Sequence, residues 1–225
     1  MSCADLATRQ TAVQMGTDSS VLQAIAQSGV ELTVWQRAPA AAWGAWLEQL
    51  PVHALPACRL ELSPDQTVPA LHASCDASGT PNTVQRHAFV ADVAAQATRF
   101  AALAATDTVR LRLDVVTSNA CRRWHRDCVP LRLLCTYRGP GTWWLPPALA
   151  EAALANPDAD NTAQAQPLQT QDVAVFKGCG WPGQGHSQGI VHRSPRIDGT
   201  GLVRLVLVLD LPHPKPSHPN TEAPT

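Results

Sequence analysis

The spacing of apolar residues changes near residue 107, and this change restricts the folds that the chain can adopt. From residue 89 to residue 103, apolar positions recur every three or four residues, which is typical of one stripe of an α-helix. Beyond the change, Leu111, Leu113 and Val115 alternate with charged residues, which is typical of a strand with one buried face. The sequence therefore predicts a helical part followed by a part built from strands.

The second part contains many short candidate strands. We expect strands within 109–115, 129–137, 142–145, 173–177, 189–192 and 203–210. So many short strands in about a hundred residues favour a barrel or a sandwich over a parallel sheet with crossover helices. The predicted class is α+β, with a mainly helical N-terminal lobe (1–106), a strand-rich core (107–211) and a disordered tail (212–225).

Proline and glycine suggest the boundaries within the N-terminal lobe, because proline cannot continue a helix and glycine readily adopts the conformation that ends one. The expected elements are a helix before Gly29, a strand at 30–35, a helix between Pro39 and Pro51, an irregular connection at 63–82, and a long helix capped by Thr83. The long helix has the clearest apolar stripe of the three.

Composition argues against several classes of function. The 225 residues carry a formal net charge of −1 without a basic run, so bulk attraction to nucleic acid or to an anionic membrane is not expected. No segment approaches the ~20 consecutive apolar residues of a membrane span, and residues 1–6 lack the features of a secretory signal. Seven cysteines without a Cys-x-x-Cys pair favour reduced thiols. We therefore expect a cytoplasmic protein.

Two histidines and an aspartate form the strongest candidate site. His125 and Asp127 are two positions apart, so in an extended chain both side chains project to one face and can chelate one ion. His192 follows far enough along the chain for a small barrel to bring it beside this pair. Two imidazoles and one carboxylate can hold one face of a non-haem Fe(II) and leave other positions open. The alternatives are a structural His–Asp hydrogen bond, a packed His192, and His186 as the third ligand.

Arg204 and Tyr137 are the candidates for binding a cosubstrate. Arg204 opens an apolar run, where an unpaired charge is expensive, so it needs an anion such as a carboxylate held by its guanidinium fork. Fe(II), Asp127, a dicarboxylate and Arg204 together carry no net charge, which suits a poorly solvated pocket. The alternative is an internal salt bridge from Arg204 to Asp114 or Asp210. Tyr137 shares the parity of the ligands, so its hydroxyl is a candidate for orienting the cosubstrate or, equally, for core packing.

These residues carry a resemblance to a known superfamily. The order His125-x-Asp127, His192 and Arg204 resembles the signature of the Fe(II)/2-oxoglutarate-dependent oxygenases. The resemblance implies a double-stranded β-helix, a cupin-like jelly-roll barrel, for 107–211. It also implies iron bound by the first three residues and 2-oxoglutarate anchored by Arg204. The activity that it implies is hydroxylation of a small-molecule or peptide substrate.

A second resemblance is closer in sequence and covers residues from about 110 to 210. This region is similar to an uncharacterised bacterial family, domain of unknown function 1826. The matching phrases are CRRWHRD at 121–127, CTYRGPGT at 135–142, KGCGWPG at 177–183 and HRSP at 192–195. The resemblance implies kinship without an assigned activity. Because members tend to be encoded near zinc-homeostasis genes, it also implies a role in metal limitation.

Two other interpretations of the metal site stay open. A cupin-like zinc enzyme without a cosubstrate would use its metal to activate a water. A non-enzymatic zinc-binding protein of metal homeostasis would use thiolates, and Cys121, Cys128 and Cys135 recur every seven residues. Alternation along the chain puts Cys128 on the opposite face from His125, so buried free thiols are the expected state. The substrate and the oligomeric state have no recognisable code in the sequence.

Overall fold

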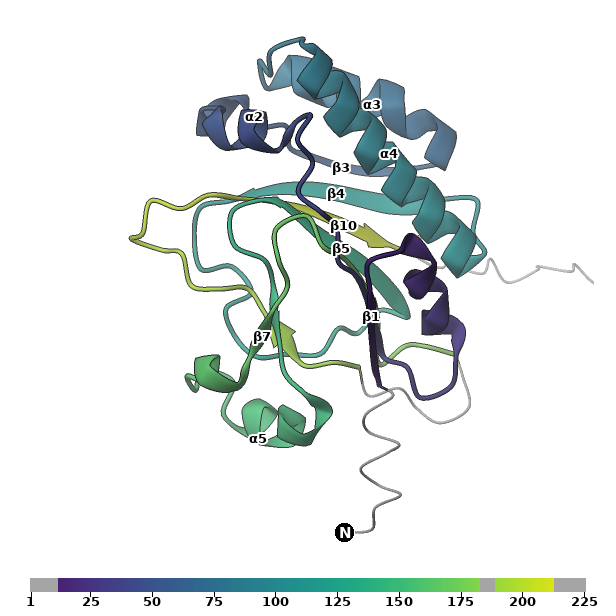
Figure 1. Ribbon diagram of the computed structural model, residues 1–225, viewed down its shortest axis with the longest axis vertical. Coiled ribbons are helices and arrows are strands. Elements are labelled where there is room, and N and C mark those ends of the chain that lie inside the picture. Colours follow the sequence, from purple (N-terminus) through teal and green to yellow (C-terminus); the bar gives the residue numbers. More distant parts are fainter. Residues whose placement is uncertain (1–11, 183–188, 213–225) are drawn as a thin grey trace, which may run out of the picture.

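The described strands form two sheets in this computed structural model, which describes residues 12–182 and 189–212 (Figure 1). The strands are Val13–Gly16 (β1), Leu32–Trp35 (β2), Cys58–Leu62 (β3), Val109–Val116 (β4), Leu131–Arg138 (β5), Trp143–Trp144 (β6), Gln166–Pro167 (β7), Val173–Lys177 (β8), His192–Arg193 (β9) and Arg204–Asp210 (β10). The larger sheet has the order β1-β2-β8-β5-β10-β4-β3, and the smaller sheet has the order β7-β6-β9.

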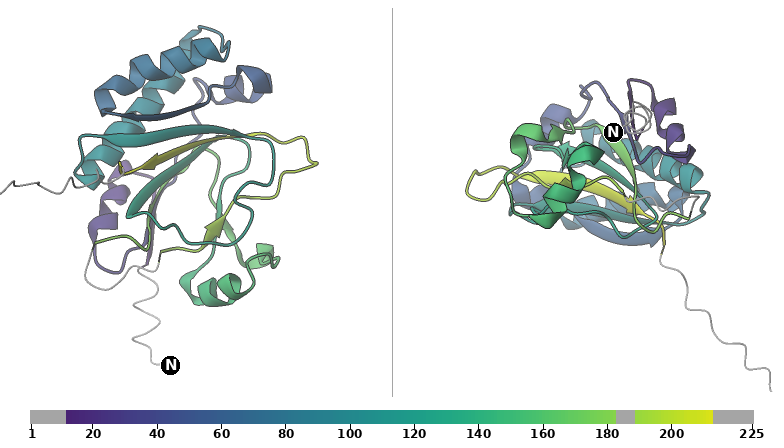
Figure 2. Two further views of the ribbon diagram at one scale, coloured as in Figure 1. Left: turned by 180° about the vertical axis from the view of Figure 1, so that it is seen from behind. Right: turned by 90° about the horizontal axis from the view of Figure 1, so that it is seen from below.

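Helices cover one face of the larger sheet, and α5 lies at the opposite end of the molecule (Figures 1 and 2). The α-helices are Gly44–Gln49 (α2), Thr67–Ala77 (α3), Val84–Ala104 (α4) and Ala150–Ala155 (α5). The 3-10 helices are Ser19–Ala26 (η1), Val52–Ala54 (η2), Pro64–Gln66 (η3), Pro147–Leu149 (η4) and Thr162–Gln164 (η5). The predicted long helix is confirmed as α4, which Thr83 caps through the N–H of Arg86 and which ends at a left-handed Ala105.

Strand β10 lies at the centre of the larger sheet and pairs antiparallel with β4 on one side and β5 on the other. Its side chains alternate between two cores. Leu205, Leu207 and Leu209 pack in the core under the helices, whereas Val206 and Val208 face a second core on the other side. Because both faces of β10 are buried, the strand is apolar at successive positions. The functional site described below lies on the second face.

The segment 63–82, expected to be irregular, contains helix α3 instead. Ser63 and Gln66 form a capping box around the preceding turn, and the Ser63 N–H donates to the Gln66 side chain. The buried positions of α3 recur every four residues: Thr67, Leu71 and Cys75. Because only one of these three is strongly hydrophobic, the apolar stripe is weak in the sequence. Burial against the core stabilises this helix more than its intrinsic propensity does.

The strand-rich part does not form the closed barrel that was expected. The hydrogen bonds between its described strands form two separate sheets. The larger sheet also takes β1, β2 and β3 from the N-terminal hundred residues, so it extends across the expected boundary at residue 106. Strands β1 and β3 lie at the two edges of that sheet. Strand β1 is four residues long and has no apolar run, so the sequence pattern does not indicate it. In β3, Cys58, Leu60 and Leu62 alternate with Arg59 and Glu61, a strand signal that the predicted elements omit.

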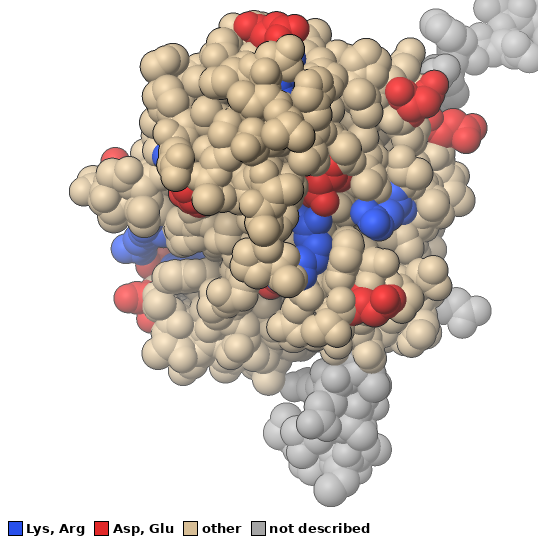
Figure 3. Space-filling view, turned by 45° about the horizontal axis from the view of Figure 1, so that its top comes forward, with Lys and Arg blue, Asp and Glu red and all other residues tan. Residues whose placement is uncertain are grey.

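No helix among the described residues is long and apolar enough to cross a lipid bilayer. Charged side chains are sparse on the helix-covered side of the molecule, where isolated acidic and basic groups lie among uncharged residues (Figure 3). This agrees with a charged fraction of 16%, below the roughly 25% of an average protein. The second face of the larger sheet differs, because several arginines line a cavity there.

Candidate metal centre

The side chains of His125, Asp127 and His192 converge on one point. One ligand atom from each lies within 4.8 Å of the others, and no second group of three or more His, Cys, Asp or Glu ligands occurs in residues 12–182 and 189–212. The His192 Nε2 lies 3.4 Å from Asp127 Oδ2, and the His125 Nε2 lies 4.0 Å from Asp127 Oδ1. The sequence predicted these three residues as a set, and the tertiary structure brings them together.

Backbone pairing holds the two histidines side by side. The His125 N–H donates to the His192 carbonyl at 3.1 Å, and the His192 N–H donates to the His125 carbonyl at 3.0 Å. The two ring centroids are 4.5 Å apart. Strand β6 pairs with His192 from the other side, through Trp144. The fixed distance between the imidazoles therefore depends on main-chain hydrogen bonds, which hold it more rigidly than side-chain packing would.

Each imidazole has one nitrogen occupied by a backbone carbonyl. The Nδ1 of His125 lies 2.9 Å from the carbonyl of Arg123, and the Nδ1 of His192 lies 2.9 Å from the carbonyl of Ile190. Because a carbonyl only accepts, each Nδ1 carries the proton, and in the neutral ring Nε2 then has a free lone pair. This orientation of a histidine by its second nitrogen is typical of metal ligands in proteins.

The charge state of His192 favours a cation at this point. Burial lowers the pKa of His192 to about 4, although the neighbouring Asp127 carboxylate opposes this shift. The ring is therefore neutral near pH 7, and its lone pair at Nε2 faces a carboxylate oxygen, Asp127 Oδ2, that is buried without a hydrogen-bond partner among the described residues. Two acceptors facing each other in a buried site need a cation between them. The donor set of two nitrogens and one oxygen fits a divalent transition metal.

Arg132 holds the other oxygen of the aspartate. Its guanidinium donates to Asp127 Oδ1 at 2.5 Å and to both oxygens of Asp210, at 2.7 and 2.9 Å. Asp127 therefore keeps one oxygen fixed and the other free to coordinate. Arg132 is not among the residues predicted from the sequence, although it lies on an apolar strand, where a charge needs a partner as it does at Arg204.

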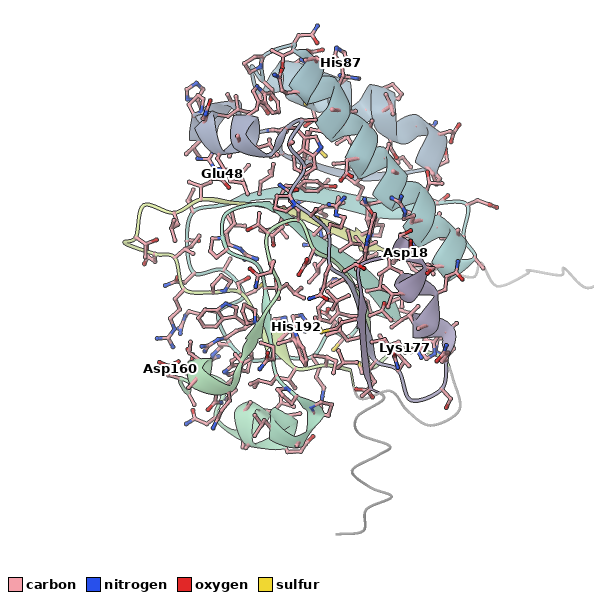
Figure 4. All side chains as sticks on the ribbon, in the orientation of Figure 1. Asp18, Glu48, His87, Asp160, Lys177 and His192 are labelled. Atoms are coloured by element: carbon pink, nitrogen blue, oxygen red, sulfur yellow. The ribbon has the colours of Figure 1, made fainter. Side chains whose placement is uncertain are left out.

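A cavity of about 380 Å³ opens beside the two histidines on the second face of the larger sheet. Figure 4 shows His192 in the interior, between that sheet and α5, while Asp160 lies at the periphery. Apolar side chains of β5 and β10 form part of the cavity wall: Leu134, Val206 and Val208. The volume falls within the range of about 300–1,000 Å³ that small-molecule sites occupy.

Arg204 lines the same cavity, and its partners within the described part of the chain are all neutral. Its guanidinium donates to the Pro140 carbonyl at 2.7 Å and to three hydroxyl oxygens: Ser194 Oγ at 2.8 Å, Thr142 Oγ1 at 3.2 Å and Thr136 Oγ1 at 3.4 Å. Burial lowers the pKa of Arg204 to about 10, because no carboxylate compensates the lost hydration. The internal salt bridge considered as an alternative is absent among the described residues. Asp114 pairs with Arg59 and Arg112 instead, and Asp210 pairs with Arg132 and Arg112.

Tyr137 lies on the helix-covered face, away from the cavity, which corrects the expectation that it shares the ligand face. Its hydroxyl donates to Asp92 Oδ2 at 2.6 Å, and its ring packs against Trp43 and Phe89. Tyr137 does not share the face of His125, because β5 begins only at Leu131. The chain between His125 and Leu131 is irregular, so its side chains do not alternate regularly between the two faces of a sheet.

The three cysteines spaced by seven do not form a site together. Cys121 lines the cavity, Cys128 is exposed, and Cys135 is buried on the helix-covered face, where Arg37 donates to its sulfur at 3.4 Å. The rival ligand His186 lies outside the described residues, as do His213 and His218. Within the described chain, the thiols therefore offer no ligand set comparable to the His–Asp–His group.

The chain is similar to one described protein family and, at low identity, to solved structures of dioxygenases. No curated protein shows significant similarity to the chain. Among solved structures, the 2-oxoglutarate complex of a dioxygenase for auxin oxidation from Arabidopsis thaliana aligns with a TM-score of 0.46 and 12% identity, over 90% of this chain and 92% of that one. A rice dioxygenase for auxin oxidation aligns with a TM-score of 0.38 and 16% identity, over 78% and 68%. Residues 16–210 match the family described as protein of unknown function DUF1826, and the chain therefore belongs to that family.

Proposed function

We propose that this protein is an Fe(II)- and 2-oxoglutarate-dependent oxygenase. One observation carries the proposal. A neutral His192 faces an oxygen of Asp127 that has no hydrogen-bond partner among the residues that the structure describes. The cavity beside them also contains Arg204, a buried arginine without an acidic partner among those same residues. The first pair needs a cation and the arginine needs an anion. A metal chelated by a dicarboxylate supplies both.

In this proposal His125, Asp127 and His192 bind the metal through two Nε2 atoms and one carboxylate oxygen. Bound iron would supply the activation of dioxygen, which no side chain of the site can perform. The backbone carbonyls at Arg123 and Ile190 keep both rings in the tautomer that coordinates. Arg132 orients the aspartate and neutralises part of the buried negative charge.

Arg204 would anchor the distal carboxylate of 2-oxoglutarate. Its guanidinium is already oriented by the Pro140 carbonyl and by hydroxyl groups, among them those of Ser194 and Thr142, so little conformational entropy is lost on binding. The hydroxyls are also potential donors to the same carboxylate. The apolar walls around them exclude water and strengthen the ion pair.

We further propose that the two sheets correspond to those of a double-stranded β-helix. In support, the candidate site lies between them, since His192 belongs to β9 of the smaller sheet and Arg204 to β10 of the larger one. Residues carried by two facing sheets can enclose a cofactor that neither sheet could hold alone.

The test is the addition of Fe(II) and 2-oxoglutarate to the full chain without oxygen. We expect a weak visible charge-transfer band, followed by iron-dependent consumption of 2-oxoglutarate when air is admitted. His192→Ala should abolish both signals, and Arg204→Gln should raise the concentration of 2-oxoglutarate needed for the band. A wild-type protein that binds Fe(II) but gives neither signal would overturn the proposal.

The zinc enzyme without a cosubstrate is the alternative that the metal ligands alone permit. Arg204 fits both functions, because a buried arginine can bind the carboxylate of a zinc enzyme's substrate as well as that of 2-oxoglutarate. Metal analysis after growth with iron distinguishes the two, since retention of zinc under those conditions would favour the alternative.

A further inference from the structure

The cavity has a second cationic end that the proposed binding of iron and 2-oxoglutarate does not use. Four arginines line it: Arg59, Arg112, Arg132 and Arg204. Arg132 is occupied by two aspartates, and Arg204 is assigned to the cosubstrate. Arg112 and Arg59 remain, and both come from the β3–β4 side of the sheet.

Arg112 is the least satisfied of the four. Its nearest carboxylate oxygens, on Asp114 and Asp210, are each 3.7 Å away, which is too far for a hydrogen bond. Its Nε is buried without a partner among the described residues. Asp114 is shared with Arg59, which donates to it at 3.0 Å, and Asp210 is held at shorter distance by Arg132. The Arg112 guanidinium has five N–H donors, and the carboxylates nearest to it are 3.7 Å away. It can therefore donate hydrogen bonds to a bound anion.

The register of the sheet places Arg112 beside the metal centre but separate from it. Val208 of β10 pairs with Arg112 on one side and with Leu134 on the other. Arg112 is therefore two strands away from β5, on the same face of the sheet. Ion pairs run from Arg112 through Asp210 and Arg132 to Asp127, and apolar cavity-lining side chains lie beside them: Leu134, Val206 and Val208. A ligand that reaches from Arg112 towards the histidines would cross a hydrophobic surface.

The net charge of the residues at this end of the cavity indicates which class of anion can bind there. The proposed metal, cosubstrate, Asp127 and Arg204 are together neutral. Arg132 is compensated by Asp210. Arg59, Arg112 and Asp114 then leave one uncompensated positive charge at this end of the cavity. A single carboxylate would neutralise it, whereas a doubly charged phosphate monoester would leave one excess negative charge beside the apolar walls of the cavity.

We propose that the primary substrate is a small monocarboxylic acid with an apolar body, whose carboxylate is bound by Arg112 with help from Arg59. This inference rests on the proposed oxygenase function. In this proposal Arg112 determines substrate specificity. The hydrocarbon of the substrate lies along Val206, Val208 and Leu134.

The experiment measures binding to the full chain loaded with redox-inactive Mn(II) and 2-oxoglutarate. The probes are hexanoate and phenylacetate, each paired with its uncharged amide, together with phenyl phosphate. We expect each carboxylate to bind at least about tenfold more tightly than its amide, as a charge-assisted contact requires, and more tightly than the phosphate. Arg112→Gln should abolish the preference and Arg112→Lys should retain part of it. Arg196→Gln, a change at an exposed arginine outside the cavity, should leave it unchanged.

The experiment distinguishes failure of this inference from failure of the proposed oxygenase function. Arg112→Gln should bind 2-oxoglutarate as the wild type does, which also shows that the variant is folded. Equal affinity for acids and amides in a wild type that binds 2-oxoglutarate would overturn the inference alone, as would a preference that survives Arg112→Gln. Failure of the wild type to bind 2-oxoglutarate would overturn the proposed function itself.

Discussion

His125 and His192 are hydrogen-bonded to each other through their main chains in both directions, at 3.1 and 3.0 Å. Two residues that are 67 positions apart therefore present their imidazoles as neighbours before any metal binds. Because each ring is also fixed by a backbone carbonyl, the site is preorganised, and a metal needs to order few side chains on binding.

Asp127→Asn tests the carboxylate ligand. The amide keeps the shape of the side chain but removes the charge, so we expect the affinity for Mn(II) to fall by at least about 100-fold. Titration calorimetry measures the change. Asp160→Asn, at an exposed aspartate far from the centre (Figure 4), is the matched control and should bind Mn(II) normally. Equal loss in both variants would exclude a specific role of Asp127.

Arg204→Met separates ligand binding from folding. The variant removes a buried charge that has no acidic partner among the described residues, so the protein without ligand should be as stable as the wild type or more stable. In the wild type with Mn(II), 2-oxoglutarate at 100 times its Kd should raise the free energy of unfolding by about 2.7 kcal/mol. The variant should lose this increase. Thermal unfolding with and without 2-oxoglutarate provides both values, and stabilisation of the variant by the cosubstrate would contradict the assignment.

Tyr137→Phe distinguishes the position seen in the structure from the role that parity suggested. The change removes the hydrogen bond to Asp92 and leaves the packing against Trp43 and Phe89, so the free energy of unfolding should fall by about 1 kcal/mol. The affinity for 2-oxoglutarate should not change, because the hydroxyl lies on the face opposite the cavity. A weaker affinity in a stably folded variant would restore the earlier assignment.

Cys135 should make folding stability fall in alkaline solution. Burial raises the pKa of this thiol from 9.0 to about 12, although the nearby Arg37 guanidinium opposes the shift. The unfolded chain therefore loses this proton near pH 9 while the folded chain keeps it, and the stability contribution is full below pH 9 and decreases above it. Burial likewise raises the pKa of Tyr137, which adds to the same trend.

Urea unfolding between pH 8 and pH 10 measures that slope, which Cys135→Ala should reduce. Alkylation provides an independent readout, because exposed Cys128 should react with iodoacetamide in the folded protein while Cys135 should not. Rapid labelling of Cys135 under native conditions would show that the helix-covered core is open to reagent.

The local sequence pattern was sufficient to predict those helices and strands whose own residues carry a clear apolar periodicity or a cap. The apolar stripe and the Thr83 cap predicted α4, alternation predicted β4 and much of β5, and a continuous apolar run predicted β10. The sequence also singled out His125, Asp127, His192 and Arg204, because charged or coordinating groups in apolar surroundings need partners wherever the chain takes them.

Only the tertiary structure decided which partners those groups meet. Arg204 lies among hydroxyls and not beside Asp114 or Asp210, and Arg132 joins Asp127 to Asp210. Tertiary contacts also decided which face Tyr137 occupies and that β1 and β3 lie at the edges of the larger sheet. They likewise produced two open sheets in place of a barrel. The pairing of strands that are distant in the sequence sets their register and the face that each side chain occupies. That pairing depends on packing throughout the core, so it cannot be predicted from any short stretch of residues.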